Sequence, residues 1–102
     1  MPSKVIEVCY DVDRIPGCSN QNPQNPTALS FRDAALRVVE DALLMADLGA
    51  GIDASVGAGE VSFRVVVADF EEAERAIWDA VWNTPYHAIR ELMRYWEADL
   101  AA

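Results

Sequence analysis

Three short stretches of the chain alternate apolar and polar positions. Residues 4–13 place Ile6, Val8, Tyr10 and Val12 on one side and Glu7, Cys9, Asp11 and Asp13 on the other. This period of two is typical of a strand with one buried face. Residues 52–56 and 60–68 alternate in the same way around Gly57-Ala58-Gly59, with Val61, Phe63, Val65 and Val67 facing inward. These two stretches therefore predict a β-hairpin.

Between these strands, apolar residues recur at the spacing of a helix. We expect this helix from Phe31 to about Leu48, with Ser30 or Thr27 as its N-cap and Gly49 as its stop. Its predicted buried face consists of Phe31, Ala34, Ala35, Val38, Ala42 and Met45. Additional leucines widen the apolar arc, so the helix is expected to be covered on more than one side.

A second helix is expected from Phe70 to about Asn83, with Asp69 as its cap. Its predicted core stripe consists of Phe70, Ala73, Ile77, Ala80 and Val81. Before the first helix, residues 14–26 are rich in Pro, Asn and Gln and predict a long loop.

The last segment admits two interpretations. Thr84-Pro85 fits the start of a third helix, with Tyr86, Ile89, Leu92, Met93, Trp96 and Leu100 on one face. As a strand, residues 88–96 would place Leu92 and Trp96 on the same side as two arginines, which is a poor alternation. The pattern favours a helix, with a fourth strand as the alternative.

Together these elements predict a single α+β domain over residues 1–102, in the order β-α-β-β-α-α. We expect a three-stranded sheet, or a four-stranded one if residues 88–96 form a strand, with helices on one face. In its order of elements the chain resembles a ferredoxin-like sandwich, or a truncated one. This resemblance rests on no motif and implies no function.

Composition narrows the class of protein. The chain has 102 residues, 52% of them hydrophobic, which fits a globular domain with its own core. No apolar run approaches the roughly 18 residues of a membrane span, and the start of the chain lacks a secretory segment. Two cysteines without such a segment favour a reduced, cytoplasmic setting. One lysine against seven arginines points to a GC-rich bacterial or phage genome.

The charge is strongly negative and unevenly distributed. The net charge is -9, and residues 40–79 carry ten acids against Arg64 and Arg75 as the bases. Such a chain is not expected to bind nucleic acid directly, because phosphate backbones are also negative. The open face of the predicted sheet is expected to lack the aromatic and basic side chains that RNA-binding sheets display there.

The second helix carries the most distinctive candidate surface. At 100° per residue, Trp78 and Trp82 lie away from the core stripe, and Arg75 lies on the same flank. Tryptophan and arginine are enriched at the centres of protein interfaces. The alternative is that the last helix folds back over both indoles. The candidate interface residues are Arg75, Trp78, Trp82 and Tyr95, with the carboxylates Glu71, Glu72 and Glu74.

Catalytic and metal-binding patterns are weak. Asp11-Val12-Asp13 superficially resembles the nucleophile motif of haloacid-dehalogenase phosphatases, but the chain is short for that fold and lacks the downstream lysine. His87 and Cys18 would form a nucleophile and base only if the fold joined them, and no third group orients them. We therefore expect no metal, no cofactor and no catalytic set.

Two functions remain open at this point. The favoured one is a non-catalytic module that binds a basic site on a partner protein, as an inhibitor, immunity protein or antitoxin does, or that forms a homodimer. The alternative is a small dimeric ligand-binding protein or enzyme with a cleft between sheet and helices. The candidate cleft residues are Tyr10, Cys18, Arg64 and His87.

Overall fold

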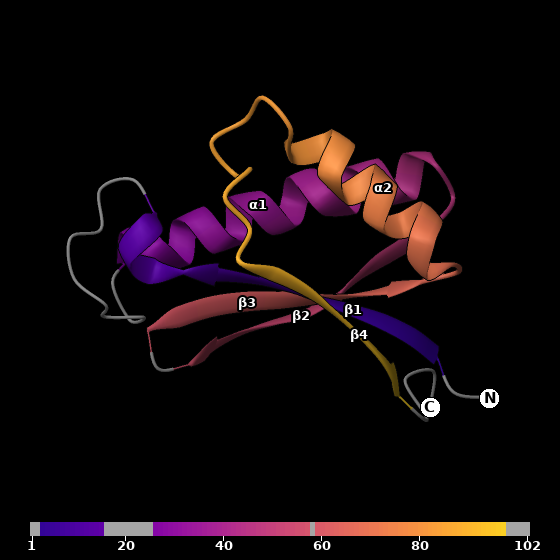
Figure 1. Cartoon of the computed structure of the whole chain (residues 1–102), viewed down its shortest axis with the longest axis horizontal. Coiled ribbons are helices and arrows are strands. Elements are labelled where there is room, and N and C mark those ends of the chain that lie inside the picture. Colours follow the sequence, from indigo (N-terminus) through magenta and orange to yellow (C-terminus); the bar gives the residue numbers. More distant parts are fainter. Residues whose placement is uncertain (1–2, 16–25, 58, 98–102) are drawn as a thin grey trace.

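The computed structural model describes residues 3–15, 26–57 and 59–97. The strands are β1 (Ser3–Asp11), β2 (Gly49–Gly57), β3 (Glu60–Val67) and β4 (Glu91–Glu97), and the helices are α1 (Pro26–Met45) and α2 (Phe70–Val81). Figure 1 shows both helices on one side of the sheet. No described element covers its other face. Most of the predicted loop, residues 16–25, lies outside the described residues, as does Ala58.

The four strands form one antiparallel sheet in the order β2-β3-β1-β4. β1 lies at the centre, where Val8 is opposite Phe63 of β3 on one side and Leu92 of β4 on the other. β2 and β3 form the predicted hairpin, and Gly59 in its turn has a φ of 72°, which glycine adopts without strain. The α+β class and the expected hairpin are thus confirmed.

The core lies between the sheet and the two helices, as the alternation of β1 and β3 predicts. Its members with no exposed surface include Ile6, Val8, Val61, Phe63, Val65, Ala35, Val39, Leu43, Ala73, Ile77 and Val81. Tyr10 is also buried, and its hydroxyl donates a hydrogen bond of 2.7 Å to the carbonyl of Tyr86. Because a buried hydroxyl without a partner costs about 1–3 kcal/mol, this bond makes Tyr10 compatible with the core.

The predicted face of α1 needs a correction. The helix begins at Pro26, and its fully buried residues are Ala28, Ala35, Val39 and Leu43. Met45, expected in the core, is 90% exposed. The buried face is shifted by about one residue toward Leu36 and Leu43, because the sheet and α2 cover that side of the helix, whereas Leu44 is exposed.

The end of α1 is also set differently from the prediction. Asp47 has a φ of 56° and occupies the left-handed position that follows a helix, and Leu48 N donates to Leu43 O at 2.8 Å. Gly49, the predicted stop, instead begins β2. A Cβ at Gly49 would lie 2.2 Å from the backbone oxygen of Val66, so glycine allows the close approach of β2 to β3.

The expected third helix is wrong, and the alternative of a fourth strand is correct. β4 pairs with β1 along its whole length. Its unfavourable alternation is accommodated by α2, because Arg94 donates two hydrogen bonds of 2.7 and 2.6 Å to Glu74. The ring centroids of Trp96 and Phe70 lie 5.8 Å apart in an edge-to-face arrangement. The arginine on the helix-facing side of β4 therefore has a charged partner on α2.

Candidate functional site

α2 exposes a stripe of side chains opposite its buried face. The Asp69 side chain accepts a hydrogen bond of 2.8 Å from Glu72 N, which confirms the predicted cap. Burial of Ala73, Ile77 and Val81 fixes the rotation of the helix. At 100° per residue, four residues then lie within about 60° of one another on the outer side. We call Glu71, Arg75, Trp78 and Trp82 the α2 stripe.

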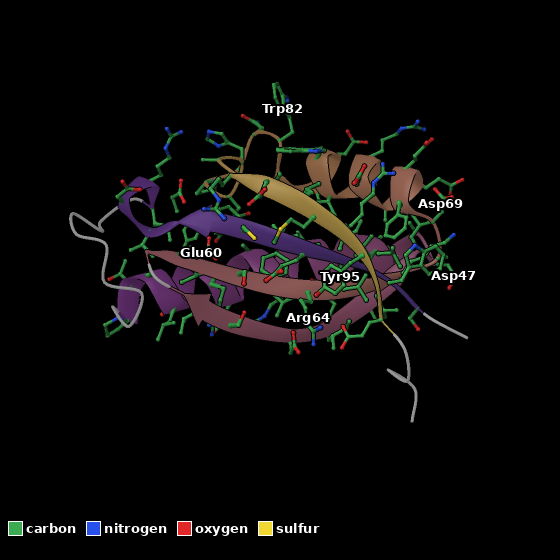
Figure 2. All side chains as sticks on the ribbon, turned by 60° about the horizontal axis from the view of Figure 1, so that its bottom comes forward. Asp47, Glu60, Arg64, Asp69, Trp82 and Tyr95 are labelled. Carbon is green, nitrogen blue, oxygen red and sulfur yellow. The ribbon has the colours of Figure 1, made fainter. Side chains whose placement is uncertain are left out.

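Both indoles of the α2 stripe face solvent. Trp78 is 42% exposed and Trp82, the residue directly after the helix, is 76% exposed. In Figure 2 the Trp82 side chain points away from the body of the molecule. The alternative that a last helix covers both rings is wrong, because that segment forms β4 in the sheet.

The charges on and beside the α2 stripe are available for binding. Among the described residues, Glu71, Glu72 and Asp79 are exposed and none of them forms an ion pair. Arg75 is exposed as well, but it does not stack on an indole in the described part of the chain. Glu74 differs from its neighbours, since Arg94 holds it and lowers its pKa. Glu74 therefore stabilises the packing of β4 on α2.

Tyr95 does not belong to this surface. The sequence placed it on a helix, whereas it lies on β4 and faces the uncovered side of the sheet, beside Arg64 (Figure 2). Arg64 Nη1 donates to the Tyr95 hydroxyl at 3.2 Å, and the guanidinium also binds Asp53 and Glu97. These hydrogen bonds raise the pKa of Arg64, and they lower that of Asp53. The expectation that this face lacks aromatic and basic side chains is thus wrong, because Tyr95 and Arg64 both lie on it.

Two further polar networks lie on the uncovered sheet face. The Ser62 hydroxyl donates to the Glu7 carboxylate at 2.9 Å and lies 2.9 Å from the Ser55 hydroxyl. Arg90, just before β4, forms ion pairs with three carboxylates that come from three strands, Asp11, Glu60 and Glu91. The sequence did not reveal these networks, because their members are distant in the chain and meet only through strand pairing.

A hollow of about 250 Å³ adjoins the α2 stripe and is lined by Trp82, Asn83 and His87. The turn that forms it is held by Thr84, whose hydroxyl donates to Val81 O at 2.6 Å and accepts from Tyr86 N at 3.1 Å. Asn83 has a φ of 67°, which asparagine tolerates better than most residues. The Thr-Pro pair that suggested a helix start thus stabilises a turn.

The candidate cleft residues do not meet in one place. Tyr10 is buried on the helix side of the sheet, whereas Arg64 lies on the opposite, uncovered face. His87 is exposed and lies in the turn after α2, where the sequence predicted the start of a third helix. Cys18 lies outside the described residues. The cleft that would unite these four side chains is therefore absent from the described part of the chain.

The described residues offer no group of three or more His, Cys, Asp or Glu side chains that could hold a metal ion. Of the two acids at the end of β1, Asp11 forms an ion pair of 3.4 Å with Arg90. Asp13 lies in the short 3-10 turn that follows the strand.

Comparisons with known proteins add no relative. No protein family, curated protein or solved structure matches the chain. Neither of the helices in the described ranges has the length and apolar character needed to cross a bilayer.

Proposed function

We propose that this protein is a non-catalytic interaction module that docks through the α2 stripe on a basic surface of a partner protein, as an inhibitor, immunity protein or antitoxin does. The observation that carries the proposal is the exposure of Trp78 and Trp82 on one side of a helix on which Glu71, Glu72 and Asp79 have no ion-pair partners among the described residues, whereas Glu74 pairs with Arg94. Exposing two large indoles to water on the same side of a helix is unfavourable unless a partner covers them.

Charge supports the choice of a basic partner. Glu71, Glu72 and Asp79 are exposed on the same helix as the indoles, and the whole chain carries a net charge of -9. Attraction to a basic partner would speed association and make its rate fall as salt is added. Tryptophan and arginine side chains are enriched among the residues that contribute most to binding, and the α2 stripe holds two tryptophans and Arg75.

We also propose that the fold is of the ferredoxin-like type. The β-α-β-β-α-β order of elements and the placement of β1 and β3 at the centre of the sheet support this assignment. The fold itself carries no argument about function.

The test begins with affinity purification of the tagged protein from its native host, followed by calorimetry with the purified partner. We expect Trp78→Ala with Trp82→Ala to weaken binding by at least about thirtyfold, since each hot-spot residue contributes about 2 kcal/mol or more. Leu44→Ala with Met45→Ala is the matched control, because these two exposed apolar side chains lie in the last turn of the other helix, α1.

Two further measurements sharpen the result. Circular dichroism should show that the double tryptophan variant remains folded, and Glu71→Gln should reduce the association rate more than Asp41→Asn does. Sedimentation of the protein alone tests the second candidate partner, another copy of this chain, which would require dimers that the tryptophan variant abolishes. A folded double variant that binds its partner as tightly as the unaltered protein would refute the proposal.

A further inference from the structure

The hollow beside the α2 stripe combines groups that favour a cation. His87 Nδ1 lies 2.6 Å from the carbonyl oxygen of Thr84. A carbonyl oxygen only accepts hydrogen bonds, so Nδ1 carries the proton. In the neutral ring, Nε2 then has a lone pair and acts as an acceptor. The turn thus fixes the tautomer that suits a hydrogen-bond donor in the hollow.

The other groups around the hollow also favour a cation. The indole of Trp82, 76% exposed, offers the aromatic face that binds cations best. Asn83 also lines the hollow, and its side chain carries an amide oxygen that can accept a hydrogen bond. The hollow also adjoins the C-terminal end of α2, where the helix dipole is negative.

No lysine or arginine in the described part of the chain lines the hollow or stacks on Trp82. Arg90 binds Asp11, Glu60 and Glu91 on the uncovered sheet face, and Arg94 binds Glu74. The cation–π contacts of the described residues lie on Phe70 and Trp96, so none involves Trp82. None of the described bases therefore fills the hollow, and a cation of another molecule can bind there.

We propose that the Trp82–Asn83–His87 hollow binds an arginine side chain of the partner protein. A planar guanidinium stacks on an indole and presents several N–H donors in fixed directions. Two separate acceptors in the hollow suit this arrangement of donors better than they suit the compact ammonium group of lysine. This inference rests on the proposed function and names the partner residue that the α2 stripe anchors.

The direct test uses acetyl-arginine amide as the probe and two-dimensional ¹H–¹⁵N spectra of the full chain. We expect saturable shifts of the Trp82 indole N–H and of the Asn83 side-chain amide, with a Kd of about a millimolar for so small a ligand. Acetyl-citrulline amide has almost the same shape without the charge and should produce no such shift.

Variants locate the site. His87→Ala and Asn83→Gly should each weaken binding of the probe about two- to fivefold, and the glycine variant keeps the positive φ of the turn available. Trp96→Phe is the control, since Trp96 is exposed on β4 and does not line the hollow. Equal binding of the citrulline probe would overturn the inference, as would shifts confined to Glu71 and Glu72 or unchanged binding in both hollow variants.

The two proposals fail separately. If the double tryptophan variant keeps full affinity for the partner, the proposed function fails. If that variant no longer binds the partner and the unaltered protein does not bind the arginine probe in the hollow, the proposed function stands and the arginine assignment is wrong.

Discussion

Cys9 shows how one buried side chain makes the stability of this protein depend on pH. Its thiol has no exposed surface, and burial together with the nearby carboxylates of Glu7 and Glu60 raises its pKa from 9.0 to about 11. The folded chain therefore holds this proton more tightly than the unfolded chain. Stability from this source is complete below pH 9 and is lost as the pH rises toward 11.

We expect the free energy of unfolding, measured by urea titration in a Cys18→Ser background, to fall between pH 9 and 11. Cys9→Ala should flatten that fall, because alanine has no proton to lose. Tyr10, whose pKa burial also raises, is unchanged in both proteins and does not affect the comparison. An identical slope for the two proteins would contradict the assignment to Cys9.

Among the elements, the edge strand β2 is held in an unusual way. Gly51 N donates a hydrogen bond of 2.9 Å to the Glu40 carboxylate of α1, at a bulge in the pairing with β3. Arg32, two turns earlier on α1, donates to the carbonyl of Ser55 at 3.3 Å. Side chains of α1 thus occupy backbone groups of an edge strand, which discourages pairing with another chain.

Glu40→Ala tests this role of α1. We expect a loss of about 1–3 kcal/mol in unfolding free energy, because the Gly51 N–H loses a charged acceptor. We also expect more self-association in sedimentation experiments, because the freed edge can pair with another strand. Arg37→Ala, an exposed change on the same helix, should do neither. If both variants behave alike, Glu40 does not protect the edge.

The elements also show what the sequence could and could not predict. Alternation in β1 and β3 and the helical spacing of α2 were sufficient to predict these elements and their core faces. They did not predict the burial of Val5, Cys9 and Ser62 on the other face of the sheet. β4 was missed because Arg94 lies on the helix-facing side of the strand, where its charge is paired with Glu74, twenty positions earlier. The α2 stripe could be predicted from local spacing, but the hollow could not. The hydroxyl of Thr84 accepts a hydrogen bond from Tyr86 N in the turn beside the hollow, and an N-cap residue at the start of a helix makes the same kind of bond.

The whole molecule is small compared with the reach of its charges at low salt. It measures 41 × 28 × 17 Å and carries a net charge of -9. At about 10 mM salt the screening length is about 30 Å, so the acids repel one another across the entire protein. The ion pairs of Arg64, Arg90 and Arg94 are local and offset only part of this repulsion.

Raising NaCl from about 10 to about 200 mM should therefore increase the thermal midpoint by a few degrees, measured by circular dichroism. Glu71→Gln with Glu72→Gln should show a smaller increase, because it removes two acids that lack ion-pair partners in the described structure. A midpoint that falls with salt would mean that the local ion pairs outweigh the repulsion.

The positions of the three tryptophans have a practical spectroscopic consequence. Trp78, Trp82 and Trp96 all retain contact with water in the folded chain, and none lies in the core. Their emission should therefore be close in wavelength to that of the denatured chain, so intrinsic fluorescence would be a poor probe of unfolding. The same emission should move to the blue when another molecule covers Trp78 and Trp82, which makes it a sensitive signal of complex formation.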